Sequence, residues 1–259
     1  WSDDAHTVDE AGLMDERAQG ALLLAVAGVA VRLGLSGSAL DYIKPSYVPL
    51  LVASGVVIGV LGALVLARAI RALDDPHDHD EASDHGHGHD HSSAPRIAWM
   101  LAAPLFAVLL VAPPPLGAFA ANRQSGVVQQ RSAVWPPLPE AVDGVVPLSL
   151  GEYAGRALYD PDLSLAGADV QLTGFVSGVL PDGFVLTRFA LSCCAADGTA
   201  IDVHVRSDQP APPVDTWVQV TGQWENRDGH VVGELTTDPP LLTAESLVRV
   251  TQPAEPYET

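Results

Sequence analysis

Long runs of apolar residues dominate the first half of the chain, at about residues 18–35, 47–67 and 97–121. The second and third runs contain no charged residue, and about 20 helical residues that rise about 1.5 Å each cross the roughly 30 Å core of a bilayer. Arg32 lies near the end of the first run, where its long side chain can reach the lipid headgroups. The prolines at 113–115 must end or kink the third helix. The pattern predicts a membrane domain over residues 1–121 with about three spans.

The second apolar run carries small residues at four-residue spacing, namely Gly55, Gly59 and Ala63. Small residues on one face of a helix let a second backbone approach closely, so we expect a helix partner at this face. Because glycine and alanine are common in membrane helices generally, the spacing alone leaves open whether this face is a specific one.

The second half of the chain has a different pattern, in which short runs alternate between apolar and polar residues and are separated by Gly, Pro and Asp. The runs predict strands at residues 170–179, 183–191, 200–206, 217–224, 231–235 and 244–250. About five strands of this length, with glycines where a strand must bend, favour a small all-β barrel of the OB type over residues 148–252. Residues 122–147 are rich in proline and predict an extended linker, and residues 253–259 form a tail.

Basic residues are unevenly distributed around the apolar runs. Those next to the first run and to the loop between the second and third are Arg17, Arg68, Arg71 and Arg96. Positively charged flanks remain in the cytoplasm, so we expect this loop to be cytoplasmic and the residues after 121 to lie outside the cytoplasmic membrane. The opposite side holds fewer basic residues, Lys44 among them, so the bias is small.

The net charge of −19 argues against nucleic acid and against anionic membrane surfaces as partners, because both need a basic face. Lys44 is the single lysine among 13 basic residues, which is typical of a GC-rich bacterial genome. We therefore expect a multi-pass protein of a bacterial cytoplasmic membrane, with the lipid bilayer as its surroundings.

The loop between the second and third runs, residues 74–95, is rich in histidine. It contains six of the nine histidines of the chain, which are His77, His79, His85, His87, His89 and His91. Neutral imidazole binds zinc and similar ions, and the glycine and aspartate spacers let the loop wrap an ion from several sides. This composition favours several weak metal sites over a single defined one. The alternative is a solvated acidic linker without a ligand.

The two cysteines are adjacent, Cys193 and Cys194, in a turn after the second predicted strand. Their thiolates and the carboxylate of Asp197 form a candidate metal site, with His204 on the next strand as a possible fourth ligand. Consecutive Cα atoms lie only about 3.8 Å apart, so a disulfide between these cysteines would be strained and easily reduced. Metal binding, redox chemistry and a structural role with one buried cysteine all remain open on the sequence.

Several short motifs, Gly174–Val176, Arg188–Phe189 and Cys193–Asp197, follow the amino-terminal spans and the charged loop. In this combination the chain resembles the bacterial YcgQ-like family of membrane proteins. The resemblance implies a system of two membrane proteins in which a many-spanning permease is the partner, and it implies a connection with the supply of a metal such as zinc. The histidine-rich loop is a separate indication of metal handling, independent of the resemblance.

These observations together predict a membrane accessory subunit, not an enzyme, that helps a permease handle a divalent transition metal, with zinc favoured. A second hypothesis is a membrane-tethered thiol oxidoreductase that uses Cys193 and Cys194. Against it, the pair lacks the two-residue spacer of the familiar redox motif. A third hypothesis is a structural subunit whose barrel docks a partner and binds no ligand.

Overall fold

The computed structural model describes residues 3–74, 114–124, 135–228 and 230–258, with the side chains of residues 16–71 in the first of these ranges. The chain divides into two compact units, which comprise residues 1–39 with 46–113 and residues 40–45 with 114–259. The histidine-rich residues 77–91 and the first part of the third apolar run, residues 97–113, lie outside the described residues. Residues 40–45, which join the first two apolar runs, belong to the second unit and not to the helices that they connect.

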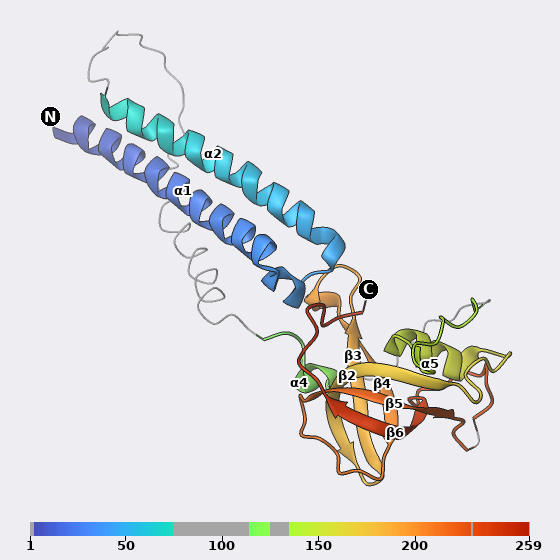
Figure 1. Ribbon diagram of the computed structural model, residues 1–259. Coiled ribbons are helices and arrows are strands. Elements are labelled where there is room, and N and C mark those ends of the chain that lie inside the picture. The colour runs from blue at the N-terminus through green and yellow to red at the C-terminus, as the bar shows by residue number, and fades with distance from the viewer. Residues whose placement is uncertain (1–2, 75–113, 125–134, 229, 259) are drawn as a thin grey trace. The chain divides into compact units, whose positions relative to one another are not determined.

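The first unit contains two long helices, α1 (Asp3–Ser36) and α2 (Val48–Asp74), which lie side by side and run in opposite directions (Figure 1). The stretches Glu16–Ser36 and Pro45–Arg71 are long and apolar enough to cross a membrane. Large apolar side chains on the outer face of α2 remain more than half exposed within the chain, among them Val57, Leu61 and Leu64. Such a face favours apolar surroundings, and the helix pair is compatible with a membrane protein.

The two helices meet through small residues, as the sequence predicted, but the contact uses Gly62 where the sequence suggested Ala63. A Cβ atom added at Gly62 would lie 2.9 Å from Leu23 Cβ and 3.1 Å from the Gly20 carbonyl oxygen. Gly55 and Gly59 also face α1, whereas Ala63 is exposed. The reason is helix geometry, because steps of four residues drift about 40° around the helix per step and a step of three corrects the drift.

Replacing Gly62 by valine is expected to separate the two helices. The added side chain would meet the backbone of α1, and such overpacking costs about 1–3 kcal/mol. Unfolding of the purified full-length chain by titration with SDS, followed by circular dichroism, measures the effect. Ala63→Val is the matched control, since Ala63 is exposed beside it. Equal loss of stability in both variants would contradict this packing.

The second unit is built on a mixed sheet of six strands. The short β1 (Val146–Pro147) runs parallel to β2. The others are β2 (Asp169–Leu180), β3 (Gly183–Ala190), β4 (Thr199–Arg206), β5 (Trp217–Glu225) and β6 (Leu241–Arg249). The order is β1-β2-β3-β4-β6-β5, and β2 also pairs with β5. All pairings among β2 to β6 are antiparallel except that of β4 with β6, which is parallel.

Two local predictions for this unit were wrong. Residues 231–235 form turns, not a strand, and large side chains there such as Leu235 are exposed, so no core contact supports an extended ladder. The helix α5 (Leu150–Tyr159) was not predicted; it begins where the Ser149 hydroxyl accepts a hydrogen bond from Glu152 N at 3.1 Å. A serine N-cap with an acidic residue three positions later is a common helix start, and that signal was missed.

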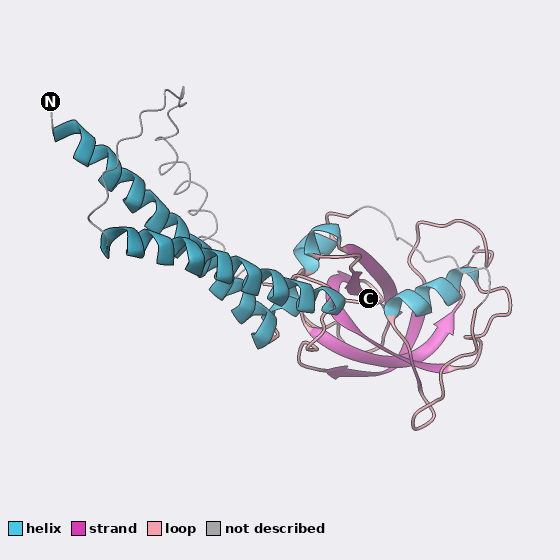
Figure 2. Cartoon of the chain, turned by 90° about the horizontal axis from the view of Figure 1, so that it is seen from above, coloured by secondary structure: helices cyan, strands magenta, loops and turns pink. Residues whose placement is uncertain are grey.

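Two apolar clusters fill the unit. The larger lies between α5 and the strands, where Tyr153 is fully buried and its hydroxyl donates to the Leu241 carbonyl at 2.7 Å. The smaller contains Phe175, Phe189 and Tyr257 together with two alanines of the short helix α4 (Ala118–Ala121). In both views α4 and α5 lie on opposite sides of the strands (Figures 1 and 2).

The position of α4 corrects the predicted end of the membrane domain. Residues 114–121 were assigned to the third span, but they belong to the second unit, with Ala118 2% exposed in its smaller apolar cluster. The apolar character of this segment reflects packing in a protein core, which hydropathy alone does not distinguish from packing in lipid. The boundary between the units therefore lies at Pro113, not at residue 121.

Candidate functional site

Three potential ligands converge in the turn between β3 and β4, where the short helix η3 (Ala195–Asp197) follows the cysteines. One Sγ each from Cys193 and Cys194 and a carboxylate oxygen of Asp197 all lie within 4.8 Å of one another. The two sulfur atoms are 3.5 Å apart and both thiols are free. Cys193 is exposed and Cys194 is partly buried, so the group is open to solvent on one side. We call these three residues the thiol–carboxylate cluster.

Asp197 organises the turn through its carboxylate. Oδ1 accepts a hydrogen bond from Ser192 N at 2.9 Å, and Oδ2 accepts from Cys193 N at 2.8 Å and Cys194 N at 3.4 Å. The bond from the Cys193 thiol, followed by those from the backbone N–H groups, lowers the pKa of Asp197 to about 2. Asp197 is therefore an anion at every physiological pH, and its charge lies beside both sulfur atoms.

The same contact has the opposite effect on the thiol. The hydrogen bond to Asp197, followed by the one to Cys194, raises the pKa of Cys193 to about 12. A thiol with so high a pKa is protonated at neutral pH and is a weak nucleophile. The arrangement thus lacks the electropositive surroundings that activate redox cysteines.

The loop that connects α1 with α2 holds one side of this turn. Ile43 and Cys194 form an antiparallel bridge, Lys44 N donates to the Cys193 carbonyl at 3.1 Å, and Ala195 N donates to the Tyr42 carbonyl at 2.7 Å. Helix η2 (Pro45–Tyr47) and α2 follow directly in the chain. Along the chain, the loop that contacts the cluster therefore ends only a few residues before the second apolar helix.

The segment Pro114–Gln124 holds the other side. The Gln124 side chain donates to the Gly198 carbonyl at 2.6 Å and accepts from Ala200 N at 2.7 Å. Farther along, the Tyr257 hydroxyl accepts from Leu116 N at 3.0 Å and donates to the Asp41 carbonyl at 2.7 Å. Tyr257 thus joins this segment to the loop between the helices. The sequence gave no indication of these supports, since the partners lie far apart along the chain.

His204, the proposed fourth ligand, lies elsewhere in the second unit. It is near the far end of β4, and its Nδ1 is 2.8 Å from a guanidinium nitrogen of Arg227, which also donates to the Pro239 carbonyl at 3.0 Å. Burial lowers the pKa of His204, and the positive charge of Arg227 lowers it further. The structure brings Cys193, Cys194 and Asp197 together and does not bring His204 to them.

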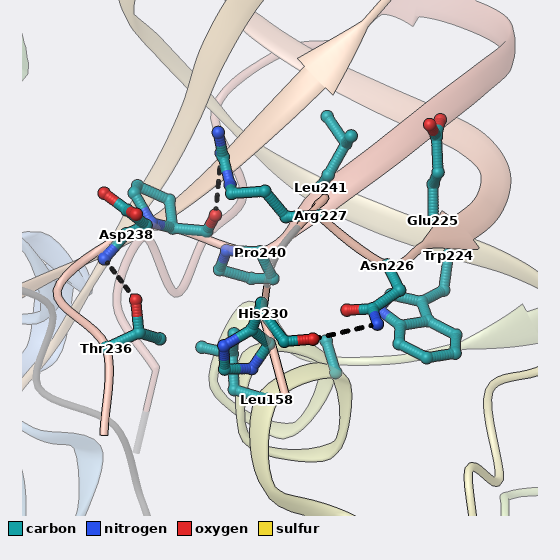
Figure 3. A pocket seen from close by; sticks show the side chains of 12 residues that line it. Leu158, Trp224, Glu225, Asn226, Arg227, His230, Thr236, Asp238, Pro240 and Leu241 are labelled. Atoms are coloured by element: carbon teal, nitrogen blue, oxygen red, sulfur yellow. Dashed lines mark hydrogen bonds between the residues drawn. The ribbon is translucent and has the colours of Figure 1, made fainter. Parts of the chain in front are cut away.

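The hollow near Arg227 is too small for a ligand. Its lining includes Leu158, Trp224 and His230, with the His230 carbonyl accepting from the Asn226 amide at 3.2 Å (Figure 3). The open space is about 10 Å³, enough for about one water molecule. His230 is partly buried and contributes to no cluster of potential ligands among the described residues.

Comparison with known protein families gives matches over most of the chain. Residues 19–126 match the DUF1980 N-terminal domain, and this range contains the second half of α1, all of α2 and the segment with α4. Residues 156–258 match the DUF1980 C-terminal domain, and this range contains β2 to β6. Neither the curated proteins nor the solved structures gave a match. The chain therefore contains both domains of the uncharacterised family DUF1980, in this order.

Proposed function

We propose that this protein is a membrane accessory subunit whose second unit binds a divalent transition metal, zinc, on behalf of a many-spanning permease. The observation that carries the proposal is the convergence of Cys193, Cys194 and Asp197 within 4.8 Å. Two thiolates and a carboxylate form a ligand set that suits zinc. A bound cation takes the place of the thiol protons, so that the negative charge of Asp197 favours the metal form.

Three protein ligands also suit transfer of the ion. Structural zinc sites are usually closed by four protein ligands, whereas sites that exchange a ligand keep one position open. The cluster offers three donors and has Cys193 exposed. A partner or a small ligand supplies the fourth donor in this proposal, and the ion leaves when that partner takes it over.

The connections of the chain support three membrane crossings. Residues 40–45 and Pro114 belong to the same unit, so the chain must leave that unit along α2 and return before residue 114. If α2 crosses a membrane, then one further crossing is required between residues 75 and 113. The uncharged residues 97–113, 17 in all, are the stretch that meets the lower limit of about 17 residues for a helical span.

The same connections support metal sites on both sides of the membrane. Loop residues 42–44, which contact the cysteines, lie before the start of α2, and the histidine-rich residues 77–91 follow its end. Helix α2 has 27 residues and so is about 40 Å long. With the basic flanks in the cytoplasm, the histidine-rich loop is cytoplasmic and the thiol–carboxylate cluster lies outside.

We further infer that the strands β2 to β6 form a five-stranded barrel of the OB type. The pairing order β2-β3-β4-β6-β5 returns to β2, and the parallel pair, β4 with β6, consists of the third and fifth of these strands in chain order. Closure removes the free edges that would otherwise pair with other chains. Such a barrel holds its loops rigidly, and the cluster lies in one of them.

A thiol redox role is the second candidate, because the sulfur atoms of Cys193 and Cys194 are only 3.5 Å apart. Exchange with a disulfide needs a thiolate, and the raised pKa of Cys193 opposes its formation. Metal binding does not share this difficulty, because a metal ion displaces the proton.

Zinc analysis of the full-length protein, purified in detergent and desalted after exposure to zinc, tests the proposal. Deletion of residues 77–91 is expected to leave about one zinc ion per chain, and adding Cys193→Ser and Cys194→Ser is expected to remove it. Ser192→Ala, at an exposed neighbour, is the matched control and should retain the ion. Absence of zinc from the deletion variant would refute the proposal. Oxidised thiols would then favour the redox role, and reduced thiols a docking role without a ligand.

A further inference from the structure

An apolar groove lies on the second unit, beside the point at which the chain leaves the third apolar run. It has a volume of about 490 Å³ and is lined by Pro114–Ala120, Phe175, Asp215, Trp217 and Gln252. This volume is in the range of ligand sites. The groove is open to solvent at its rim, where the Phe119 side chain is 71% exposed. Its floor is aromatic, with Phe175 and Trp217 in edge-to-face contact at 5.7 Å.

The polar groups of the groove already have partners. Asp215 accepts from Ala118 N at 2.7 Å, and Gln252 donates to Asp41 Oδ1 at 3.3 Å. An occupant therefore meets mainly apolar and aromatic surface. The guanidinium of Arg123 lies 4.1 Å from the centre of the Phe119 ring, which places a positive charge beside the most exposed aromatic side chain of the rim.

Two chain connections lie at this groove. The uncharged apolar run of residues 97–113 ends directly before Pro114 in the lining. The loop before α2 is joined to the same place, because the Tyr257 hydroxyl bonds both Leu116 N and the Asp41 carbonyl. The groove is thus only a few residues of chain from two apolar segments of membrane-spanning character.

We propose that this face of the second unit rests on the bilayer and that lipid fills the groove. The apolar ring of Phe119 enters the boundary between headgroups and acyl chains, and Arg123 reaches the phosphate groups. Lipid is favoured over a protein partner as the occupant because the groove lining continues along the chain directly into the uncharged apolar run of residues 97–113. The inference rests on the membrane placement of the apolar helices and on no step of the metal proposal.

Nitroxide labels on single cysteines test the contact. The full-length chain with Cys193→Ser and Cys194→Ser receives one new cysteine and is reconstituted into vesicles of phosphatidylcholine and phosphatidylglycerol. The positions are Phe119→Cys, with Pro114→Cys as a second groove position, Val57→Cys on the outer face of α2, and Leu235→Cys. Leu235 is a matched control for exposure because it is 79% exposed and lies in the connection that leaves β5 at the end opposite Trp217.

Collisions of the label with oxygen, which partitions into lipid, are compared with collisions with chromium oxalate, which remains in water. We expect the ratio of the two collision rates at 119 and 114 to resemble that at 57 and to exceed that at 235 several-fold. A ratio at 119 and 114 equal to that at 235 would overturn the inference, as would protection from both reagents, which indicates a protein occupant. A low ratio at 57 would refute the membrane placement itself, which separates the two failures.

Discussion

Asp197→Ala is expected to weaken zinc binding on the order of 100-fold, although both cysteines remain. The variant loses a ligand, and it also loses the acceptor for three backbone N–H groups that shape the turn, those of Ser192, Cys193 and Cys194. Competition with a chromophoric chelator at fixed pH, in the chain without residues 77–91, measures the dissociation constant.

Asp197→Asn separates the two roles of this carboxylate. The amide oxygen can still accept from the backbone, but the negative charge is gone, so we expect a loss of about 10-fold. Asp228→Asn is the matched control, because Asp228 is exposed in a turn away from the cysteines. Unchanged affinity in Asp197→Ala would show that the two thiols bind zinc without this carboxylate and would remove Asp197 from the site.

Arg156→Met is expected to lower the free energy of unfolding of the second unit by about 3 kcal/mol, because the buried guanidinium donates hydrogen bonds to three groups that would lose their partner. Arg156 is only 2% exposed, although it carries a charge. Its guanidinium donates twice to Glu152, at 2.8 and 3.0 Å, and also to the Pro136 carbonyl at 2.8 Å and the Ser164 hydroxyl at 3.1 Å. The same group lies 5.3 Å from the centre of the Trp135 ring.

These contacts tie residues 135–136 to α5, so the loss should be visible in the fluorescence of Trp135 during unfolding of the full-length chain by guanidinium chloride. Arg206→Met is the matched control. Arg206 makes a comparable pair of bonds to Glu225, at 2.6 and 2.7 Å, but its side chain is 44% exposed and water can replace the partner. If Arg206→Met destabilises the protein as much as Arg156→Met, burial is not what makes the Arg156 network important.

The strands were predictable because their signal is local. Alternation of apolar and polar residues predicted 170–179, 183–191, 200–206 and 217–224, and the observed β2 to β5 agree to within one residue at each end. The last strand begins at Leu241, three residues earlier than predicted, since two consecutive buried leucines interrupt the alternation at its start. Burial on one face of a sheet imposes a period of two on the sequence, and this period survives without knowledge of the partners.

The candidate site was predictable in part for the same reason. Cys193, Cys194 and Asp197 lie within five residues, so one turn brings them together whatever the rest of the fold does. His204 required a prediction of long-range geometry. It lies seven positions after Asp197, and β4 extends at about 3.4 Å per residue, so the strand carries the imidazole away from the turn.

By itself the sequence determined the two apolar helices, the sheet-forming half and the ligand types in one turn, because hydropathy, periodicity and short spacing are properties of neighbouring residues. Only the tertiary structure decided that residues 40–45 and 114–124 belong to the second unit and support the turn that carries the cysteines. Those contacts join segments up to 216 residues apart, as in the bond from Tyr257 to Asp41. They depend on which surfaces of segments far apart in the chain fit one another, and no local pattern of residues encodes that.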